Sequence, residues 1–299
     1  MDYLIYVINQ SINGLKLGSV YALTAIGYSI VYGILRLINF AHGDILMLGV
    51  YAAFFLLSLK VIPLAAVVLG AIGFAMVMGL AVERIAYRPL RAASEESTLI
   101  SSLAVSVFIQ NLAVMMFSPQ RRAFRLPAYL TELHQFGFVR ISTMNIAIFA
   151  VTALVLVILS LVIKKTRIGM AMRACSDNLA AARLVGIKVD RVVAFAFLVG
   201  SGLAALAGIM LAGEYKTIDP LMGMVPGLKA FVAAVLGGIG SFAGAALGGI
   251  ILGLAEMLFA GLLPPGMTMY RDALVFVILI LVLLVRPNGI LGSSDGKRS

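Results

Sequence analysis

The chain has 299 residues, of which 62% are hydrophobic and only 12% are charged. A water-soluble domain carries roughly 45–50% apolar residues and about twice that share of charge. Together with a mean hydropathy of +1.08, the composition excludes an ordinary soluble enzyme. A membrane-spanning helix takes about 20 residues to cross roughly 30 Å of hydrocarbon, so the apolar residues suffice for about eight or nine crossings and leave little for a soluble domain.

Apolar stretches of near-membrane length recur along the whole chain when it is scanned in windows of about 19 residues. They cover residues 17–35, 44–59, 61–82, 97–117, 143–163, 192–213, 224–239, 242–261 and 271–285. Residues 3–16 contain several polar side chains, so they either add a crossing or lie in the membrane interface. The sequence therefore predicts an all-α polytopic membrane protein with about eight or nine transmembrane helices, forming a single transmembrane domain over residues 1–299.

Basic residues indicate how the chain is oriented. Three basic segments separate the apolar spans: residues 83–96, residues 164–191 and the tail from Arg286. Because Lys and Arg gather in cytoplasmic loops, we assign these segments to the cytoplasm and attribute the net charge of +10 to orientation in the lipid bilayer, not to nucleic acid binding. Loop 118–142 then lies outside despite its arginines. Either this basic loop meets an acidic partner surface, or the statistical rule fails there.

Two short segments resemble each other. Residues 38–43 read INFAHG and residues 218–223 read IDPLMG. Each follows a glycine-containing apolar span and combines Asn or Asp with a small or helix-breaking residue and a glycine, which is typical of a broken or re-entrant helix. We therefore predict broken helices at both positions and a possible inverted internal repeat. Chance similarity between two apolar sequences is the alternative.

Polar side chains at or inside the spans are candidates for a substrate pathway. An ionisable group at membrane depth costs about 3 kcal/mol or more, so it usually faces a bundle interior or an aqueous cavity. The pathway candidates near the two breaks are Asn39, His42, Asp44, Glu214 and Asp219. For the acids, an interfacial position or a helix cap is the alternative, and for His42 a buried structural role. Gln110 and Asn111 are expected to form interhelical hydrogen bonds.

Glycines predict a close helix contact near the last spans. Gly240, Gly244 and Gly248 repeat every four residues. On a helix, this spacing places them on one face, where another helix can approach closely. Static packing is the simplest interpretation of this stripe, and a seam that slides during gating is the alternative.

The sequence offers no constellation for catalysis. The only Gly-Lys pair, Gly296-Lys297, is followed by Arg298, so the chain has no phosphate-binding P-loop. The two histidines, His42 and His134, lie far apart and in no metal-binding motif. We therefore predict no catalytic residues, no metal site and no cofactor bound by this chain.

The basic segment 164–191 carries a second functional signal. Ser176 or Asp177 can cap a short helix over residues 178–184, and Gly186 can end it. This helix would expose apolar side chains, among them Leu184, in a cytoplasmic loop. We therefore predict that it docks onto a cytoplasmic partner. A helix lying on the bilayer surface is the alternative.

Longer stretches carry a family resemblance. They are GLKLGSVYALTAIGYSIVYGILRLINFAHGDILMLGVY (14–51), VERIAYRPLR (82–91), RACSDNLAAARLVGIKVDRV (173–192), GLKAFVAAVLGGIGSFAGAALGGIILGLAE (227–256) and PNGILG (287–292). In these residues the sequence resembles the LivH-type inner-membrane permeases of branched-chain amino acid ABC importers. Loop 118–142 matches least.

The resemblance implies a multi-pass permease of the bacterial inner membrane with several partners. These are a second, LivM-like permease, two cytoplasmic LivG/LivF-like ATPases that bind ATP and Mg²⁺, and a periplasmic amino-acid-binding protein. In such importers a cytoplasmic loop helix fits a cleft on the ATPase. The residues that match this coupling helix are Asp177, Asn178, Ala181, Leu184, Gly186 and Ile187.

The expected mechanism is alternating access, in which closure of the ATPases moves the coupling helices. Two alternatives stay open. One is a permease of the same family for urea, short amides or other amino acids. The other is a stand-alone secondary transporter, which would need an ion-coupling carboxylate deep in a span, whereas the acidic residues are expected near span ends.

Overall fold

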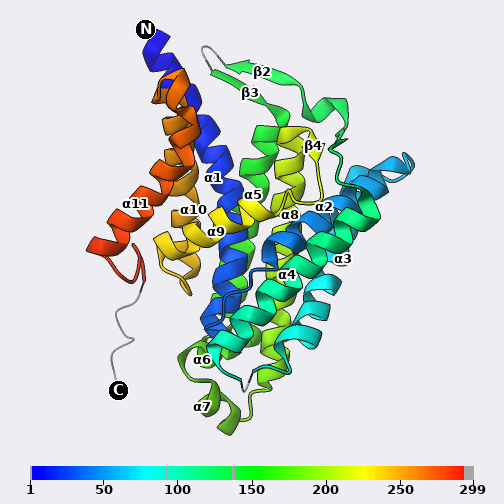
Figure 1. Ribbon diagram of the computed structural model, residues 1–299, viewed down its shortest axis with the longest axis vertical. Coiled ribbons are helices and arrows are strands. Elements are labelled where there is room, and N and C mark those ends of the chain that lie inside the picture. Colours follow the sequence, from blue (N-terminus) through cyan, green and yellow to red (C-terminus); the bar gives the residue numbers. More distant parts are fainter. Residues whose placement is uncertain (1, 92, 137–138, 293–299) are drawn as a thin grey trace.

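The computed structural model describes residues 2–91, 93–136 and 139–292, and these are mostly helical (Figure 1). The elements are α1 (Asp2–Leu35), α2 (His42–Ser58), α3 (Leu64–Val82), the π-helix η1 (Glu83–Tyr87), α4 (Glu95–Phe117), β1 (Arg122–Ala123), the 3-10 helix η2 (Ala128–Leu130), β2 (Leu133–Phe136), β3 (Val139–Ser142), α5 (Thr143–Lys165), α6 (Arg167–Asp177), α7 (Leu179–Leu184), α8 (Val189–Tyr215), β4 (Thr217–Ile218), α9 (Met224–Gly237), α10 (Phe242–Leu262), the 3-10 helix η3 (Pro265–Tyr270) and α11 (Arg271–Val285).

The predicted apolar spans coincide with helices, and only the first differs by more than three residues at either end. Residues 3–16 do not form a separate interfacial segment, because α1 is continuous from Asp2 to Leu35. Two of their polar side chains bond back to the same helix. Asn9 Nδ2 donates to the carbonyl oxygen of Ile5, and Ser11 Oγ donates to that of Val7, both at 2.9 Å.

Six of the described helices are long and apolar enough to cross a membrane: α1, α3 with η1, α4, α5, α8 and α10. The helices that follow the two predicted breaks are shorter, with 17 residues in α2 and 14 in α9. A complete crossing takes about 20 residues. The polytopic all-α fold with broken helices is therefore confirmed, whereas the total of eight or nine crossings stays a prediction.

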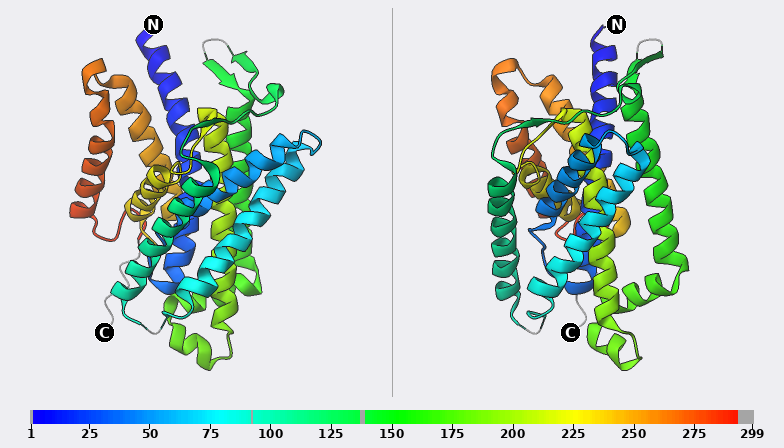
Figure 2. Two further views of the ribbon diagram at one scale, coloured as in Figure 1. Left: turned by 45° about the vertical axis from the view of Figure 1, so that its right-hand side comes forward. Right: turned by 90° about the vertical axis from the view of Figure 1, so that its right-hand side faces the viewer.

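The helices form two halves of opposite direction. In the first half, a long helix (α1), a break, a short helix (α2) and two further helices follow in order, and α8–α11 repeat this order. α1 begins at the end of the molecule where β2 and β3 lie, whereas α8 begins at the end where α6 and α7 lie (Figures 1 and 2). This is the inverted arrangement that the two similar segments predict.

Glycines hold the central helices in backbone contact. A Cβ on Gly27 of α1 would lie 3.0 Å from the carbonyl oxygen of Gly200 on α8, and a Cβ on Gly200 would lie 3.1 Å from that of Gly27. On α10, Gly249 and Gly253 lie against the backbone of α1. The interior is therefore built on close helix crossings that larger side chains would prevent.

The predicted glycine stripe is only partly helical. Gly244 and Gly248 lie in α10 and pack against the backbone of α9 at Gly237 and Ala233. Gly240 precedes α10, so its placement on the helix face was wrong. It has a φ of +91°, and its N–H donates to Ser29 Oγ of α1 at 2.9 Å. A turn, and not a helix, therefore brings Gly240 against its neighbour.

Loop 118–142 forms a small β structure. β2 and β3 make an antiparallel hairpin, and β1 pairs with β4, which directly follows α8. Arg122 lies opposite Ile218 in this ladder. The loop of the first half is thus attached to the break of the second half.

Gly249→Ala tests the backbone contact between α10 and α1. The added methyl group would overlap the main chain of Ala22, so α1 must shift. Such overpacking is expected to lower the free energy of unfolding by about 1–3 kcal/mol. Cys175 is the only cysteine, it is buried, and burial raises the pKa of its thiol. A thiol-reactive fluorescent dye therefore reports thermal unfolding, because it reacts with Cys175 when unfolding exposes the thiol.

Gly73→Ala is the matched control, because a Cβ at Gly73 of α3 would have no atom within 4 Å. Its melting temperature should equal or exceed that of the parent chain, since alanine favours a helix over glycine. Equal melting temperatures for the two variants would contradict the close contact.

Candidate functional site

The two breaks have the same backbone construction. α1 is followed by Arg36 with a φ of 56°, and α8 is followed by Lys216 with a φ of 57°. A left-handed residue at this position ends a helix. In residues 39–42 and 219–222 alike, the N–H of the last residue donates to the carbonyl oxygen of the first at 3.1 Å. The similarity between the segments therefore extends to their conformation.

The two breaks lie against each other in the interior. Gly43 in the first turn of α2 and Gly223 just before α9 are so close that a Cβ on either would overlap the backbone carbonyl group of the other. A Cβ on Gly227 of α9 would lie 2.9 Å from the Cα of Gly43. The N-terminal ends of the two half-helices therefore meet at glycines, and no side chain fits between them.

Asn39 and His42 at the first break are buried. Asn39 Oδ1 accepts a hydrogen bond from Tyr87 Oη of η1 at 2.9 Å. The His42 ring centroid lies 4.4 Å from that of Tyr28, and the ring occupies the space that a Cβ on Gly27 would need. His42 Nε2 has no hydrogen-bond partner among the described residues. Asn39 thus holds the break in place, and His42 packs between α1 and α2.

Asp44 connects its half-helix to α4. Its carboxylate accepts hydrogen bonds from Ser106 Oγ at 2.5 Å and Gln110 Nε2 at 3.0 Å. The predicted interhelical bond of Gln110 is therefore confirmed. The prediction for Asn111 is wrong, because its Nδ2 donates to the carbonyl oxygen of Val107 on its own helix at 2.8 Å.

Glu214 and Asp219 lie near the second break and have partners of their own. Lys16 Nζ donates to Glu214 Oε1 at 2.5 Å, which joins α1 to the end of α8. Asp219 Oδ1 accepts from the N–H of Leu221 at 3.0 Å, and its Oδ2 lies 3.8 Å from Arg121 Nε. The five predicted pathway residues thus form separate contacts and not one cluster.

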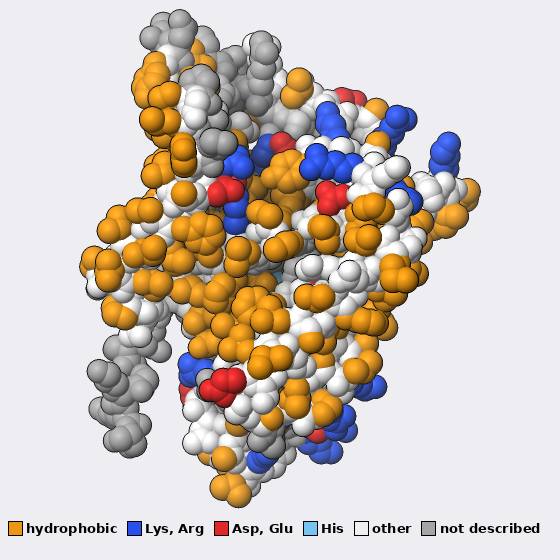
Figure 3. All heavy atoms as spheres, in the orientation of Figure 1, with side chains coloured by type: hydrophobic (Ala, Val, Ile, Leu, Met, Phe, Trp, Pro, Cys, Tyr) orange, Lys and Arg blue, Asp and Glu red, His pale blue; other side chains and the backbone are white. Residues whose placement is uncertain are grey.

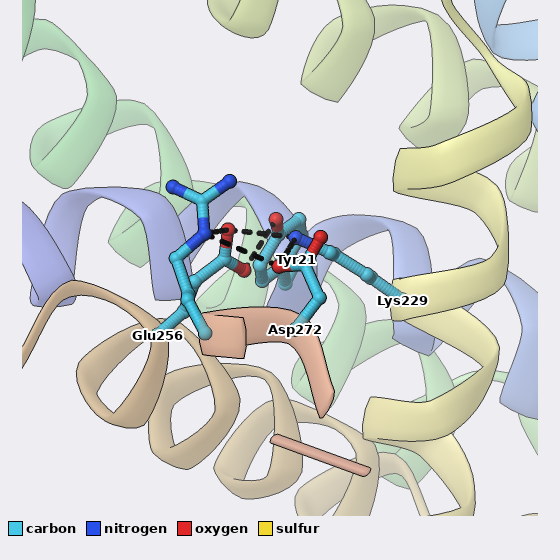
Figure 4. Close-up of polar contacts among 5 residues, drawn as sticks. Tyr21, Lys229, Glu256 and Asp272 are labelled. Carbon is cyan, nitrogen blue, oxygen red and sulfur yellow. Dashed lines mark hydrogen bonds and ion pairs between the residues drawn. The ribbon is translucent and has the colours of Figure 1, made fainter. Parts of the chain in front are cut away.

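A charge cluster with a buried centre at Lys229 and Glu256 joins α1, α9, α10 and α11 (Figure 4). Lys229 Nζ donates to Glu256 Oε1 at 2.7 Å and to Asp272 Oδ1 at 2.9 Å. Tyr21 Oη donates to Glu256 Oε2 at 2.9 Å, and Arg271 Nε donates to Asp272 Oδ1 at 3.2 Å. The half-helix α9 is thereby tied to both helices that follow it.

This cluster is not among the predicted site residues, although the sequence carries a signal for it. Lys229 and Glu256 each stand inside an apolar span, and charges of opposite sign at membrane depth usually pair. The expectation that acidic residues lie near span ends is wrong for Glu256, which is 2% exposed in α10.

The predicted docking segment is a helix with a different cap. α7 covers residues 179–184, and Asn178 Oδ1 accepts from the N–H of Ala181 at 3.0 Å. Ser176 and Asp177 belong to α6, so neither is the cap. Gly186, with a φ of +84°, lies beyond the helix end. Leu184 and Val185 form an apolar tip with exposures of 89% and 76%, and Ile187 is partly buried.

Known proteins resemble this chain over its whole length. Residues 10–283 match the model of the family described as branched-chain amino acid transport system / permease component. The chain is 42% identical to the high-affinity branched-chain amino acid transport system permease protein LivH of Escherichia coli K12, with 99% of both chains covered. It is 43% identical to the corresponding protein BraD of Pseudomonas aeruginosa, with 100% of both covered. A probable LivH of Methanocaldococcus jannaschii is 31% identical, with 90% of this chain and 88% of that chain covered.

Lys229→Met tests the buried charge cluster. The substitution leaves Glu256 and Asp272 without their ammonium partner. Removing one member of a buried pair costs about 3–5 kcal/mol, so the melting temperature measured at Cys175 should fall sharply. After Lys229→Met, the buried Glu256 keeps only Arg271 as a cationic partner, at 3.7 Å. The double variant Lys229→Met with Glu256→Gln should recover part of the loss, because the more deeply buried negative charge is then removed.

Arg121→Met is the control for a solvent-exposed ion pair. Its side chain is 80% exposed beside Asp219, so little change in melting temperature is expected. A loss for Lys229→Met no larger than that for Arg121→Met would show that the cluster does not contribute to stability.

Proposed function

The chain belongs to the family of permease components of branched-chain amino acid transport systems, and from this premise we propose that it works as the LivH-type subunit of an ABC importer. It carries leucine, isoleucine, valine or related amino acids across the bacterial inner membrane. The observation that carries the proposal is similarity over the full chain to LivH and BraD. The helical membrane fold with its inverted halves supports the same function.

Energy for transport comes from partner ATPases in this proposal. The sequence has no P-loop, so LivG/LivF-like subunits would bind ATP and Mg²⁺. The apolar tip at Leu184 and Val185 supports a contact with them, because a lone loop gains nothing by exposing such side chains to water. Asn178, Ala181 and Gly186 shape the tip through the cap and the turn after the helix.

The substrate route runs between this chain and a LivM-like permease. Gly43 and Gly223 bring the half-helices into backbone contact, which leaves no space for an amino acid between them. In this arrangement Asn39, His42 and Asp44 support the breaks, and they reach the substrate only if α2 moves. The half-helices border the route and transmit movement of the coupling loop to it.

A periplasmic amino-acid-binding protein delivers the substrate at the opposite end. The end that carries β1 and the β2–β3 hairpin lies away from α7 (Figure 1). Arg121 and Arg125 are exposed there. A basic surface of this kind suits a partner with an acidic docking face, since complementary charge accelerates and orients association.

A stand-alone secondary transporter is the second candidate, and the buried carboxylate of Glu256 is the observation in its favour. Glu256 is already bound by Lys229 and Tyr21, so it is not available to a transported cation in this conformation. Liposomes that contain the chain alone distinguish the two functions. Leucine uptake driven by a proton or sodium gradient, without ATPase subunits, would refute the importer.

Leu184→Asp tests the coupling contact in the importer expressed with its partners. Burying a carboxylate in an apolar cleft costs several kcal/mol, so co-purification of the ATPases and ATP-driven leucine uptake should both fall about tenfold or more. The control Val61→Asp changes an equally exposed apolar side chain, at 88%, in the α2–α3 connection. It should leave co-purification of the ATPases unchanged. Normal ATPase association for Leu184→Asp would refute the coupling assignment.

A further inference from the structure

A basic cleft of about 610 Å³ lies where η1, the segment after α7 and the start of α8 meet. Its positively charged lining residues are Arg84, Arg88, Arg183, Lys188 and Arg191. Two carboxylates, Glu83 and Asp190, also line it. Figure 3 shows basic side chains gathered at the lower right of the molecule, at the end where α3 and α8 approach α7. None of the functions assigned above uses this cleft.

The positive charge of the cleft is not neutralised within the described chain. Glu83 pairs with Arg91, and Asp190 pairs with Arg88 at 2.8 Å and with Arg91 at 2.5 Å. Both carboxylates are therefore already engaged. Within the described residues, the other four basic side chains form no ion pair with a carboxylate. Like charges that share one cleft repel, so the site favours an anion.

Exposed apolar side chains lie on η1 and on α3, the helix that leads into η1. Ile85, next to Arg84 in η1, is 78% exposed. On α3, Leu69 and Val77 are also exposed, and they share one helix face because they lie eight residues apart. Gly73 between them opens onto free space. The acyl chain of a phospholipid can lie along these exposed side chains while the headgroup of the same lipid reaches the cleft.

We propose that the cleft binds the phosphate of an anionic glycerophospholipid from the cytoplasmic leaflet. Guanidinium groups bind phosphate oxygens through paired N–H donors, and basic pockets between transmembrane helices on the cytoplasmic side suit acidic headgroups. The exposed apolar side chains of α3 favour a lipid over a soluble acidic protein, because a lipid has acyl chains that must also be kept out of water. The bound lipid joins η1 of the first half to the coupling loop before α8.

The test uses the full chain purified in detergent and stripped of lipid. Dioleoylphosphatidylglycerol is titrated and binding is followed by native mass spectrometry and by the melting temperature at Cys175. The parent chain should bind this lipid and melt at a higher temperature, whereas dioleoylphosphatidylcholine should have no such effect. Arg84→Gln with Lys188→Gln should weaken binding about tenfold or more, since two charged contacts are lost.

The matched control is Arg121→Gln with Arg125→Gln, which removes the same charge at the opposite end. It should bind the lipid like the parent chain. An equal loss in both double variants would overturn the site, because binding would then reflect overall charge. If the first pair fails to fold, Arg183→Gln with Lys188→Gln, both outside the membrane helices, takes its place.

Two further outcomes would overturn the proposal. If glycerol 1-phosphate stabilises the chain as well as the phospholipid does, the cleft binds a soluble phosphate. If the Arg84 and Lys188 substitutions abolish association with the ATPases but leave phosphatidylglycerol binding unchanged, the cleft is a protein interface.

Discussion

This fold depends on one constraint: backbone N–H and C=O groups inside the hydrocarbon need hydrogen-bond partners. An unpaired N–H or C=O inside a membrane costs several kcal/mol, so an interrupted helix is tolerated only where protein surrounds the interruption. Both breaks meet this condition. Asn39 and Ile218 are buried, with exposures of 3% and 0%, and glycines bring the two half-helices together. The inverted halves and the long helices α1 and α8 enclose this contact.

Polar side chains complete the arrangement by tying each half-helix to a later helix of its own half. Asp44 fixes α2 to α4, and Lys229 fixes α9 to α10 and α11. Buried ionic pairs add little net stability compared with apolar packing, but they oppose alternative registers. These helices meet at glycines, without interlocking side chains, so the polar contacts help to fix the depth of each half-helix.

The sequence predicts the helices well because lipid exposure imposes a composition that is visible locally. It also predicts the two breaks, since their similarity reflects a shared backbone conformation. Hydrogen-bond partners that are far apart in the chain cannot be predicted from local sequence in this way. Ser176 does not cap α7 because its Oγ donates to the carbonyl oxygen of Gly33 on α1 at 2.6 Å. Gly240 similarly leaves the helix for a turn that reaches Ser29. Both outcomes follow from contacts between residues more than 140 positions apart.

The short ladder between β1 and β4 has a mechanical consequence. It attaches the loop of the first half to Ile218, immediately before the second break, while Gly43 and Gly223 join the halves at the centre. The two halves are thus joined at two places, the β1–β4 ladder and the glycine contact. Displacement of one half is therefore passed to the other half at both contacts, and the ladder couples loop 118–142 to the second break.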